Sequence, residues 1–426
     1  MNASEIKEKI KYIDIEYIYS CRTEERSRYE ARFEKVLDGF CETFGDGDGM
    51  RIFSAPGRTE IGGNHTDHQH GAVLAGGLNL DVIGVCRLNG TNEIRIKSEG
   101  YPMDIVNLSE LEANESEFGR SESLIRGVAA EFAKRGYTLS GFDAYTISSV
   151  LKGSGMSSSA AFEVLVGNMI NSLFAEGAVN AVEIAKIGQY AENKYFGKPC
   201  GLLDQMASSV SGMVAMDFAS PQKPIVEKID FDFASTNHAL CIIDTGADHS
   251  DLTDEYAAIT VEMRKVANFF GKDFLNDVKK EDFIAKIKEI RAETGDDRAV
   301  LRALHYFNET QRAKEEAAAL KAGDFDKFLE IVKKSGFSSY MYLQNVYASS
   351  QPHAQAVSLA LALCDEILGE RGAYRVHGGG FAGTIQAFVP YDMLEEFKTK
   401  TEAVLGEGMC HILSIRPVGG CEIKLK

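Results

Sequence analysis

The sequence predicts an α+β protein that folds into two lobes. Its 426 residues exceed the size of one ordinary core and suggest two lobes of roughly 200 residues each. Hydrophobic residues make up 44% of the chain and only 8 residues are proline, so a compact fold is expected. Strand-like and helix-like patterns occur in separate blocks, which favours mixed or antiparallel sheets over a doubly wound parallel sheet.

The first part of the chain should begin with helices and continue into strands. Residues 1–49 read as helical, and residues 28–44 place their apolar side chains on one face of a surface helix. The next segment, MRIFSAP, reads as a short strand that ends at Pro56-Gly57. Further strands are expected at 73–85, 93–97 and 142–150, and a helix at 122–135.

Two helices should precede the boundary between the lobes. Apolar residues recur at helical spacing over residues 160–174, and a second helix is expected at 181–194. The Pro- and Lys-containing stretch near 220–224 is the best candidate boundary, which gives lobes at 1–220 and 221–426, with the final strand packing on either. After the boundary we expect a strand at 239–245 and charged helices over 256–334.

Composition excludes several classes of function. The chain has 63 acidic and 46 basic side chains, and a net charge of -17 disfavours general binding to nucleic acid or anionic membranes. The eight cysteines show no C-x-x-C spacing, which fits a reduced cytoplasm. The start of the sequence lacks the pattern of a signal peptide, and the longest apolar run, residues 356–364, is too short to cross a membrane.

A Gly/Ser turn, KGSGMSSSAA, directly precedes the helix expected at 160–174. Glycines let the backbone approach an anion, and the N–H groups at a helix start can hold phosphate oxygens. The common nucleotide-binding pattern G-x-x-x-x-G-K-[ST] does not occur in the sequence, because Lys152 comes before these glycines. A serine-rich helix cap is the alternative interpretation.

A second glycine motif, HGGGFAGTIQAFV, places Gly378, Gly380 and Gly383 at the spacing of a dinucleotide-binding fingerprint. That fingerprint requires a helix after its last glycine, whereas the residues after Gly383 alternate like a strand. The segment is therefore expected to form a tight hairpin that presses against a ligand or another loop.

An unusual density of polar side chains follows the first strand, in GRTEIGGNHTDHQHG. One interpretation is a divalent metal site, and the other is a polyol pocket in which amide, imidazole and carboxylate groups bind hydroxyls and Arg58 faces a phosphate. A solvated loop is also possible. The candidate metal ligands are His65, Asp67, His68 and His70.

One acidic residue follows a Pro-Cys-Gly turn in AENKYFGKPCGLLDQMASS. A single aspartate such as Asp204 is usually a surface residue. Beside a phosphate loop and an arginine, however, it is the group that phosphoryl transfer to an alcohol requires, because it can orient the hydroxyl or accept its proton.

Taken in order, these segments resemble the GHMP family of small-molecule kinases, which includes galactokinase, homoserine, mevalonate and phosphomevalonate kinases. The resemblance covers most of the chain, and within the family it is to the galactokinase branch. SAPGR with HTDHQHG is similar to the galactokinase signature, KGSGMSSSAA to the phosphate-binding loop, and HGGGFAGT to the C-terminal glycine motif. ETQRAKEEAAALKAGDF resembles a helix typical of that branch.

The resemblance implies a two-lobed fold with the active site between the lobes, and roles for individual residues. Asp204 and Arg58 would be catalytic, and Ser158 and Glu192 would bind Mg²⁺. The implied ATP-binding residues are Gly153, Ser154, Gly155, Met156, Ser157, Ser158, Ser159 and Gly380. The implied sugar-binding residues are Asn64, His65, Asp67, Gly201 and Tyr256.

The resemblance implies an ATP- and Mg²⁺-dependent sugar 1-kinase that makes galactose 1-phosphate in the cytoplasm, as a monomer or weak homo-oligomer. Galactokinases usually carry Asn-Leu-Ile-Gly-Glu before His-Thr-Asp, whereas this chain has EIGGN, so Asn64 replaces an acid near the sugar C6 hydroxyl. An amide does not repel a carboxylate, so galacturonate or another C6-modified or C6-lacking sugar is an alternative substrate.

Three other functions remain as alternatives at this point. The HTDHQHG segment argues against another activity of the superfamily. A non-catalytic galactose and ATP sensor is disfavoured because Arg58, Asp204 and the phosphate-loop serines are all present. A metallohydrolase would need more ligands than the scattered histidines elsewhere provide.

Overall fold

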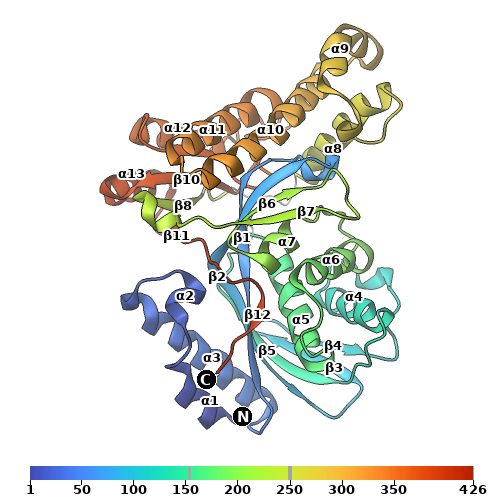
Figure 1. The fold of residues 1–426 in the computed structure, drawn as a ribbon, viewed down its shortest axis with the longest axis vertical. Coiled ribbons are helices and arrows are strands. Elements are labelled where there is room, and N and C mark those ends of the chain that lie inside the picture. Colours follow the sequence, from blue (N-terminus) through green and yellow to red (C-terminus); the bar gives the residue numbers. More distant parts are fainter. Residues whose placement is uncertain (152–154, 248–251, 426) are drawn as a thin grey trace.

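The computed structural model describes residues 1–151, 155–247 and 252–425 of the chain. Two β-sheets organise it: the larger one runs from the bottom of Figure 1 up to β6 and β7, and the smaller one lies beneath the helices at the upper left. Gly153 and Ser154, which were expected to bind ATP, lie outside the described residues. The mixture of helices with mixed and antiparallel sheets confirms the predicted α+β class.

The larger sheet contains eight strands within the described residues. Its order is β12-β1-β2-β5-β3-β4, and β6 and β7 extend from β2. Every pair is antiparallel except β3 and β5. The strands are β1 (Arg51–Gly62), β2 (Ala72–Leu88), β3 (Glu93–Ser98), β4 (Met103–Asn107), β5 (Phe142–Ser148), β6 (Met213–Asp217), β7 (Ile225–Ile229) and β12 (Cys421–Glu422).

Helices cover both faces of this sheet because its strands are apolar on both faces. Ile52 packs with the three helices that begin the chain, whereas its neighbour Phe53 packs in the core formed with the helices of the opposite face. The first group is α1 (Ala3–Ile10), α2 (Ile15–Tyr19) and α3 (Arg26–Phe44), and the second is α4 (Ser121–Lys134), α5 (Ser158–Phe174), α6 (Ala181–Ala191) and α7 (Leu203–Val210).

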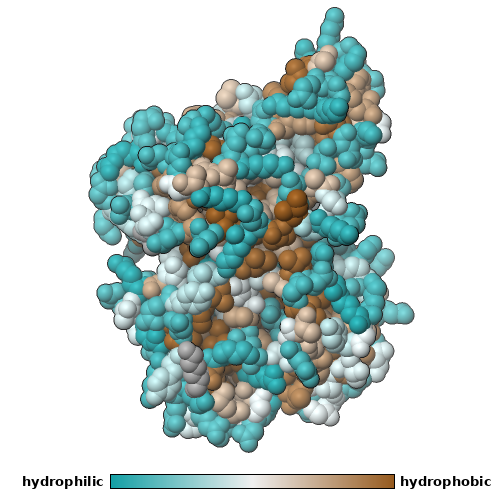
Figure 2. Space-filling model, in the orientation of Figure 1, coloured by the Kyte–Doolittle hydropathy of each residue, from teal (hydrophilic) through white to brown (hydrophobic). Residues whose placement is uncertain are grey.

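The smaller sheet is antiparallel, with the order β11-β8-β10-β9. Its strands are β8 (His238–Asp244), β9 (Ala373–Val376), β10 (Thr384–Pro390) and β11 (Cys410–Leu413). The helices of this part are α8 (Thr253–Phe269), α9 (Lys280–Thr294), α10 (Asp297–Lys321), α11 (Phe325–Ser338), α12 (Ala356–Leu368) and α13 (Leu394–Leu405). The face shown in Figure 2 is largely hydrophilic, with hydrophobic residues gathered between the upper helices and the larger sheet.

Most predicted elements are confirmed, including the helix at 160–174 and the hairpin of the second glycine motif, which β9 and β10 form. The prediction of a short strand that ends at Pro56 is wrong. β1 continues to Gly62, with irregular pairing to β2 at Pro56/Arg58 and at Glu60/Gly62, because the strand passes the proline with a local shift of register. As a result Arg58 lies within a strand.

The expected boundary at residue 220 stays a prediction. β7 and β12 both follow that boundary in the chain, yet both pair with strands of the larger sheet. The helix expected at 181–194 ends at Ala191 and continues as one π-helical turn, Glu192–Phe196. Within the described residues, no helix is both long enough and apolar enough to span a membrane.

Candidate active site

Arg58 and Asp204 form the centre of the candidate site. Arg58 Nε donates to Asp204 Oδ1 at 2.7 Å, and Nη2 lies 2.7 Å from the same oxygen. Arg58 Nη1 also donates to the carbonyl of Gly155, and its backbone N–H donates to the carbonyl of Met156 at 3.1 Å. One arginine therefore joins the carboxylate to the described end of the phosphate loop.

The two residues meet because α7 is fixed to β1. Asp204 lies in the first turn of α7, and Ser208, one turn later, donates to the carbonyl of Pro56 at 2.6 Å. Gly57 leaves space for the phosphate loop, since a Cβ atom there would lie 3.1 Å from the Met156 carbonyl oxygen. The irregular part of β1 thus presents Arg58 to both α7 and the phosphate loop.

The charge of Asp204 is set by its partners. Partial burial alone would raise its pKa, but the charge and hydrogen bonds of Arg58, with a hydrogen bond from Ser157, hold the pKa of Asp204 below its usual value. Its side chain retains 32% of its accessible surface, so the face away from Arg58 stays open. Asp204 is therefore an ionised, accessible carboxylate at neutral pH.

The described part of the phosphate loop leads directly into α5. Ser157 has a left-handed backbone conformation, with φ 53°, and α5 begins at Ser158. The side chain of Met156 is fully buried in the core, so only its backbone can face a ligand. Unpaired N–H groups at the start of a helix favour phosphate oxygens.

Glu192, one of the two predicted metal ligands, is buried beside this helix start. Its Oε1 accepts a hydrogen bond from Ser159 Oγ at 3.2 Å and lies 3.4 Å from Lys198 Nζ. Its Oε2 accepts from Gln205 Nε2 at 2.7 Å. The hydroxyl that bonds Glu192 here is thus that of Ser159, the neighbour of the predicted ligand Ser158.

The donors around Glu192 fit a hard divalent cation. The Glu192 carboxylate and the Ser159 hydroxyl supply oxygen ligands, beside Lys198 Nζ and Gln205 Nε2, and the nearby Glu163 Oε1 is buried without a hydrogen-bond partner among the described residues. No group of three or more His, Cys, Asp or Glu side chains in the described part of the chain could hold a metal ion, so such a site would need ligands of other kinds. The alternative metal site at His65, Asp67, His68 and His70 is therefore not supported.

Asp67, in the polar loop (residues 63–71), contacts Gly201 in the turn that precedes Asp204. A Cβ atom on Gly201 would lie 1.8 Å from Asp67 Oδ2, so the two residues are in direct contact and a larger residue at 201 would require the Asp67 side chain to move. Burial, followed by the negative charges of Asp204 and Glu60, raises the pKa of Asp67 to about 7. Asp67 can therefore donate as well as accept a hydrogen bond near neutral pH.

Asn64 faces the protein and is fully buried. Its amide nitrogen donates to Glu60 Oε1 at 2.8 Å and to the carbonyl of Gly378 at 2.7 Å, and its Oδ1 accepts from Asn345 Nδ2 at 2.8 Å. Both amide hydrogens are engaged. The contact between Asn64 and a sugar stays a prediction.

Tyr256 and His65 hold the second glycine motif over the polar loop. The Tyr256 hydroxyl donates to the carbonyl of Gly380 at 2.8 Å, and His65 Nε2 lies 2.9 Å from the carbonyl oxygen of Gly379. Burial lowers the pKa of His65 to about 4, so its ring is neutral. Together with Asn64, these side chains bind the carbonyls of Gly378, Gly379 and Gly380, three successive residues of the glycine turn between β9 and β10.

Several residues of this site were not found from the sequence. Gln205 and Glu163 contact Glu192 or its partner, and Arg375 pairs with Glu60 at 2.9 Å. Two local signals were available: Gln205 follows Asp204 directly, and Glu163 lies one helical turn after Ser159. Nothing near Arg375 in the sequence indicates Glu60, because the contact joins segments 315 residues apart.

Two family models match the segments that build this site. The model of the GHMP kinase N-terminal domain matches residues 123–212, and the galactokinase galactose-binding signature matches residues 38–88. In these two segments the chain is similar to the GHMP kinases.

Within that family the chain is similar to galactokinases. It is 28% identical to the galactokinase of Clostridium tetani (strain Massachusetts / E88) over 381 residues, which cover 88% of this chain and 92% of that protein. Lactococcus lactis galactokinase, crystallised with galactose, superposes with a TM-score of 0.78 at 24% identity, over 91% of this chain and 99% of that one. The mevalonate kinase of Methanococcus jannaschii gives a TM-score of 0.60 at 14% identity, over 84% and 96%.

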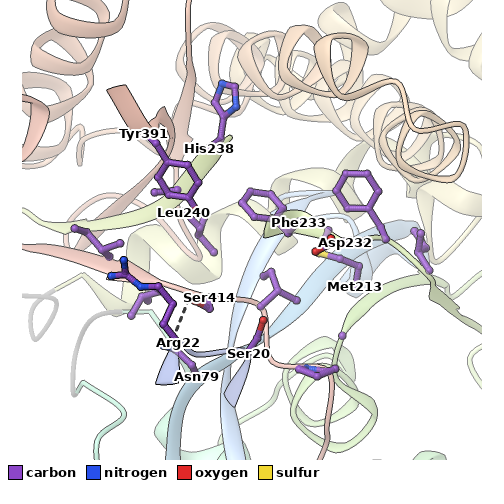
Figure 3. A pocket seen from close by; sticks show the side chains of 18 of the residues that line it. Ser20, Arg22, Asn79, Met213, Asp232, Phe233, His238, Leu240, Tyr391 and Ser414 are labelled. Atoms are coloured by element: carbon purple, nitrogen blue, oxygen red, sulfur yellow. Dashed lines mark hydrogen bonds between the residues drawn. The ribbon is translucent and has the colours of Figure 1, made fainter. Parts of the chain in front are cut away.

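A cavity of about 1140 Å³ lies away from these residues. It opens between the segment after α2, the end of β7 and the strands β8 and β11, and the predicted site residues do not line it. Phe233 and Leu240 are among its lining residues, and Asn79 and Ser414, which also line it, are joined by a hydrogen bond of 3.1 Å (Figure 3).

Proposed function

We propose that this protein transfers the γ-phosphoryl group of ATP to the C1 hydroxyl of galactose, which gives galactose 1-phosphate and ADP. The observation that supports this most is the contact of Arg58 with both Asp204 and the phosphate loop, beside the loop that contains Asp67. The similarity to galactokinases and the match to their galactose-binding signature support the choice of sugar.

In this proposal Asp204 acts on the sugar and Arg58 acts on the phosphate. The sugar oxygen forms a bond to the γ-phosphorus as the bond from phosphorus to the bridging oxygen of ADP breaks, and the hydroxyl proton moves to the Asp204 carboxylate. Arg58 keeps Asp204 ionised before the transfer and offsets the charge on the phosphoryl oxygens during it.

The phosphate loop would hold the triphosphate. Gly155, Ser157 and the N-terminus of α5 are placed for this role, and Ser158 with Glu192 would hold Mg²⁺, helped by the hydroxyl of Ser159. Mg²⁺ held there would offset negative charge on the phosphates. Lys198 is exposed enough to leave Glu192 when the cation binds.

Asp67, His65, Gly201 and Tyr256 would bind the sugar. Asp67 lies beside the catalytic turn, and His65 and Tyr256 hold the glycine turn that we expect to cover the ligand. Since Asp67 has a pKa of about 7, it can exchange hydrogen bonds with sugar hydroxyls as donor or acceptor. The contact with Gly201 keeps its position fixed.

A second candidate substrate is a sugar altered at C6. Galactokinases usually have an acid at the position of Asn64, and both amide hydrogens of Asn64 are already bound to Glu60 and Gly378. That arrangement offers neither the usual acceptor for a C6 hydroxyl nor a charge that would repel a uronic acid. A non-catalytic sensor is disfavoured by the intact contact of Arg58 with Asp204.

We also propose that the protein acts in the cytoplasm as a monomer or weak homo-oligomer, without nucleic-acid or membrane partners. The eight cysteines, all among the described residues, are free. The net charge of -17 disfavours binding to nucleic acid and anionic membranes, so an anionic ligand such as ATP has to bind at a local cationic site.

A panel of sugars tests the proposal directly. ADP release should be measured with ATP, Mg²⁺ and galactose, 2-deoxygalactose, 6-deoxygalactose (fucose), galacturonate, glucose or mevalonate. We expect the highest kcat/KM with galactose. Preference for galacturonate or fucose would favour the second candidate, and no sugar-dependent ADP release with any compound would contradict a sugar kinase.

A further inference from the structure

The side-chain amide of Gln205 joins two buried carboxylates. Its Nε2 donates to Glu192 Oε2 at 2.7 Å and to Glu163 Oε2 at 3.0 Å. Gln205, Glu163 and Glu192 have exposed fractions of 0%, 1% and 2%, so water does not replace these bonds. The two amide hydrogens are the donors that keep the two acids together at this depth.

The amide is oriented with its nitrogen toward both acids. In this orientation it donates to Glu192 Oε2 and to Glu163 Oε2. In the observed orientation Gln205 Oε1 has no hydrogen-bond partner among the described residues, so the contact with the acids outweighs that loss. The structure therefore retains an unsatisfied carbonyl in order to hold both acids.

Gly188 packs directly against two of these side chains, those of Glu163 and Gln205. A Cβ atom on Gly188 of α6 would lie 3.1 Å from Glu163 Oε2 and 3.2 Å from Gln205 Cγ. Glu163 comes from α5, Gln205 from α7, and Glu192 from the π-helical turn after α6. The Gln205 amide therefore connects three separate elements that pack beside the larger sheet.

The two oxygens of Glu192 have different environments. Oε2 is held by the buried amide of Gln205, whereas Oε1 faces Ser159 and the exposed side chain of Lys198, at 3.2 and 3.4 Å. An ammonium at 3.4 Å with 64% of its side chain exposed is a weakly held partner. Oε1 is thus the oxygen that is presented to an incoming cation.

We propose that Gln205 is a positioning residue that orients Glu192 toward the divalent cation and fixes the distance from that cation to Asp204. Asp204 and Gln205 are consecutive in the first turn of α7, so a shift of the amide moves the carboxylate that faces the substrate. The role of the cation itself rests on the proposed function. The two hydrogen bonds from Gln205 to Glu163 and Glu192 do not depend on which sugar is the substrate.

Gln205→Met tests this role, because methionine keeps the length of the side chain and removes both donor hydrogens. Gln189→Met is the matched control: Gln189 lies on the neighbouring helix α6 and donates to the Cys200 carbonyl at 3.3 Å, and its amide is not the one that bonds Glu163 and Glu192. Binding of Mn²⁺ to each protein with a non-hydrolysable ATP analogue should be followed by electron paramagnetic resonance.

We expect Gln205→Met to weaken Mn²⁺ binding by about 10- to 100-fold, as is typical when a group that orients a metal ligand is lost. Gln189→Met should bind Mn²⁺ as the wild type does. In turnover assays, raising the Mg²⁺ concentration should recover part of the activity of Gln205→Met. Equal Mn²⁺ affinity in Gln205→Met and the wild type would overturn the proposal.

A second variant keeps the test decisive if Gln205→Met does not fold. Gln205→Asn keeps the donor hydrogens on a side chain that is shorter by one methylene, so it should reach only one of the two acids. Its Mn²⁺ affinity should lie below that of the wild type, and an unchanged affinity would again count against the role of Gln205. The Mn²⁺ titration contains no sugar. If the galactose assay failed, the Mn²⁺ affinities would therefore still test the role of Gln205.

Discussion

Asn64 and Glu60 are paired by a hydrogen bond of 2.8 Å within the polar loop, and Arg375 of the smaller sheet holds the same Glu60 oxygen at 2.9 Å. In the galactokinase pattern, Asn and Glu stand at these two positions in the opposite order. The acid and the amide have therefore exchanged positions in this chain. The acid, Glu60, forms an ion pair with Arg375 inside the protein instead of facing a ligand.

Replacing Asn64 should destabilise the protein. Asn64→Ala leaves the Gly378 carbonyl without its side-chain partner in a buried place, and it removes one of the two acceptors of the Asn345 amide. We expect the free energy of unfolding to fall by about 2–3 kcal/mol, since each unsatisfied buried group costs roughly 1–3 kcal/mol. Chemical denaturation measures this, and a change below about 0.5 kcal/mol would show that Asn64 does not fasten the glycine turn.

Removing the charge of Asp204 should stop turnover without removing ATP binding. Asp204→Asn keeps the shape of the side chain but cannot accept the hydroxyl proton, so kcat should fall by roughly 10²- to 10⁴-fold. Asp217→Asn is a control, because Asp217 pairs with Lys314 at 2.8 Å away from the site. Turnover by Asp204→Asn equal to that of the control would remove the proposed base.

Arg58→Met should slow the reaction and also change its pH dependence. Loss of a cation that stabilises the phosphoryl oxygens is expected to lower kcat by about 10²- to 10³-fold. Because Arg58 lowers the pKa of Asp204, its removal should raise that pKa, so residual activity should be lost at a higher pH on acidification than in the wild type. Profiles of kcat/KM against pH that decline at the same pH would contradict this coupling.

Asp67 should make the stability of the protein depend on pH. Its pKa is about 7 in the folded protein because of burial and the charges of Asp204 and Glu60, against the ordinary value of 3.8. Between these values the folded state binds a proton that the unfolded state has lost, so this group lowers stability as pH rises from about 4 to 7.

Asp67→Asn removes that dependence. The variant should gain stability relative to the wild type as pH is raised from 5 to 7.5, and denaturant unfolding at both pH values measures the difference. A difference that is the same at both pH values would mean that Asp67 is already ionised at pH 5. The variant should also bind sugar more weakly than the wild type.

The spacing of apolar residues was sufficient to predict the elements that pack through one face. The helix expected at 160–174 is present because its apolar residues repeat at helical spacing and pack in the main core. The end of β1 could not be found in this way. Pro56-Gly57 is a local signal for a break, but pairing with β2 continues to Gly62, and long-range pairing outweighed the local signal.

The site was predictable only in part. Asp204, Arg58 and the serines of the phosphate loop were found through a resemblance in ordered motifs, and the structure places Arg58 on Asp204. The partners that orient them, such as Gln205 and Arg375, come from contacts between distant segments, which leave no pattern in a single sequence. The role of Asn64 likewise depends on residues more than 200 positions away.

The most direct test of the central claim is the position of the new phosphate ester. Galactose and ATP should be incubated with the wild-type protein and Mg²⁺, and the product examined by ³¹P and ¹H NMR correlation. We predict a phosphorus that couples to the anomeric H1, with far less of this product from Asp204→Asn in the same time. A phosphorus that couples to H6, or the release of inorganic phosphate without any sugar phosphate, would contradict transfer to C1 at this site.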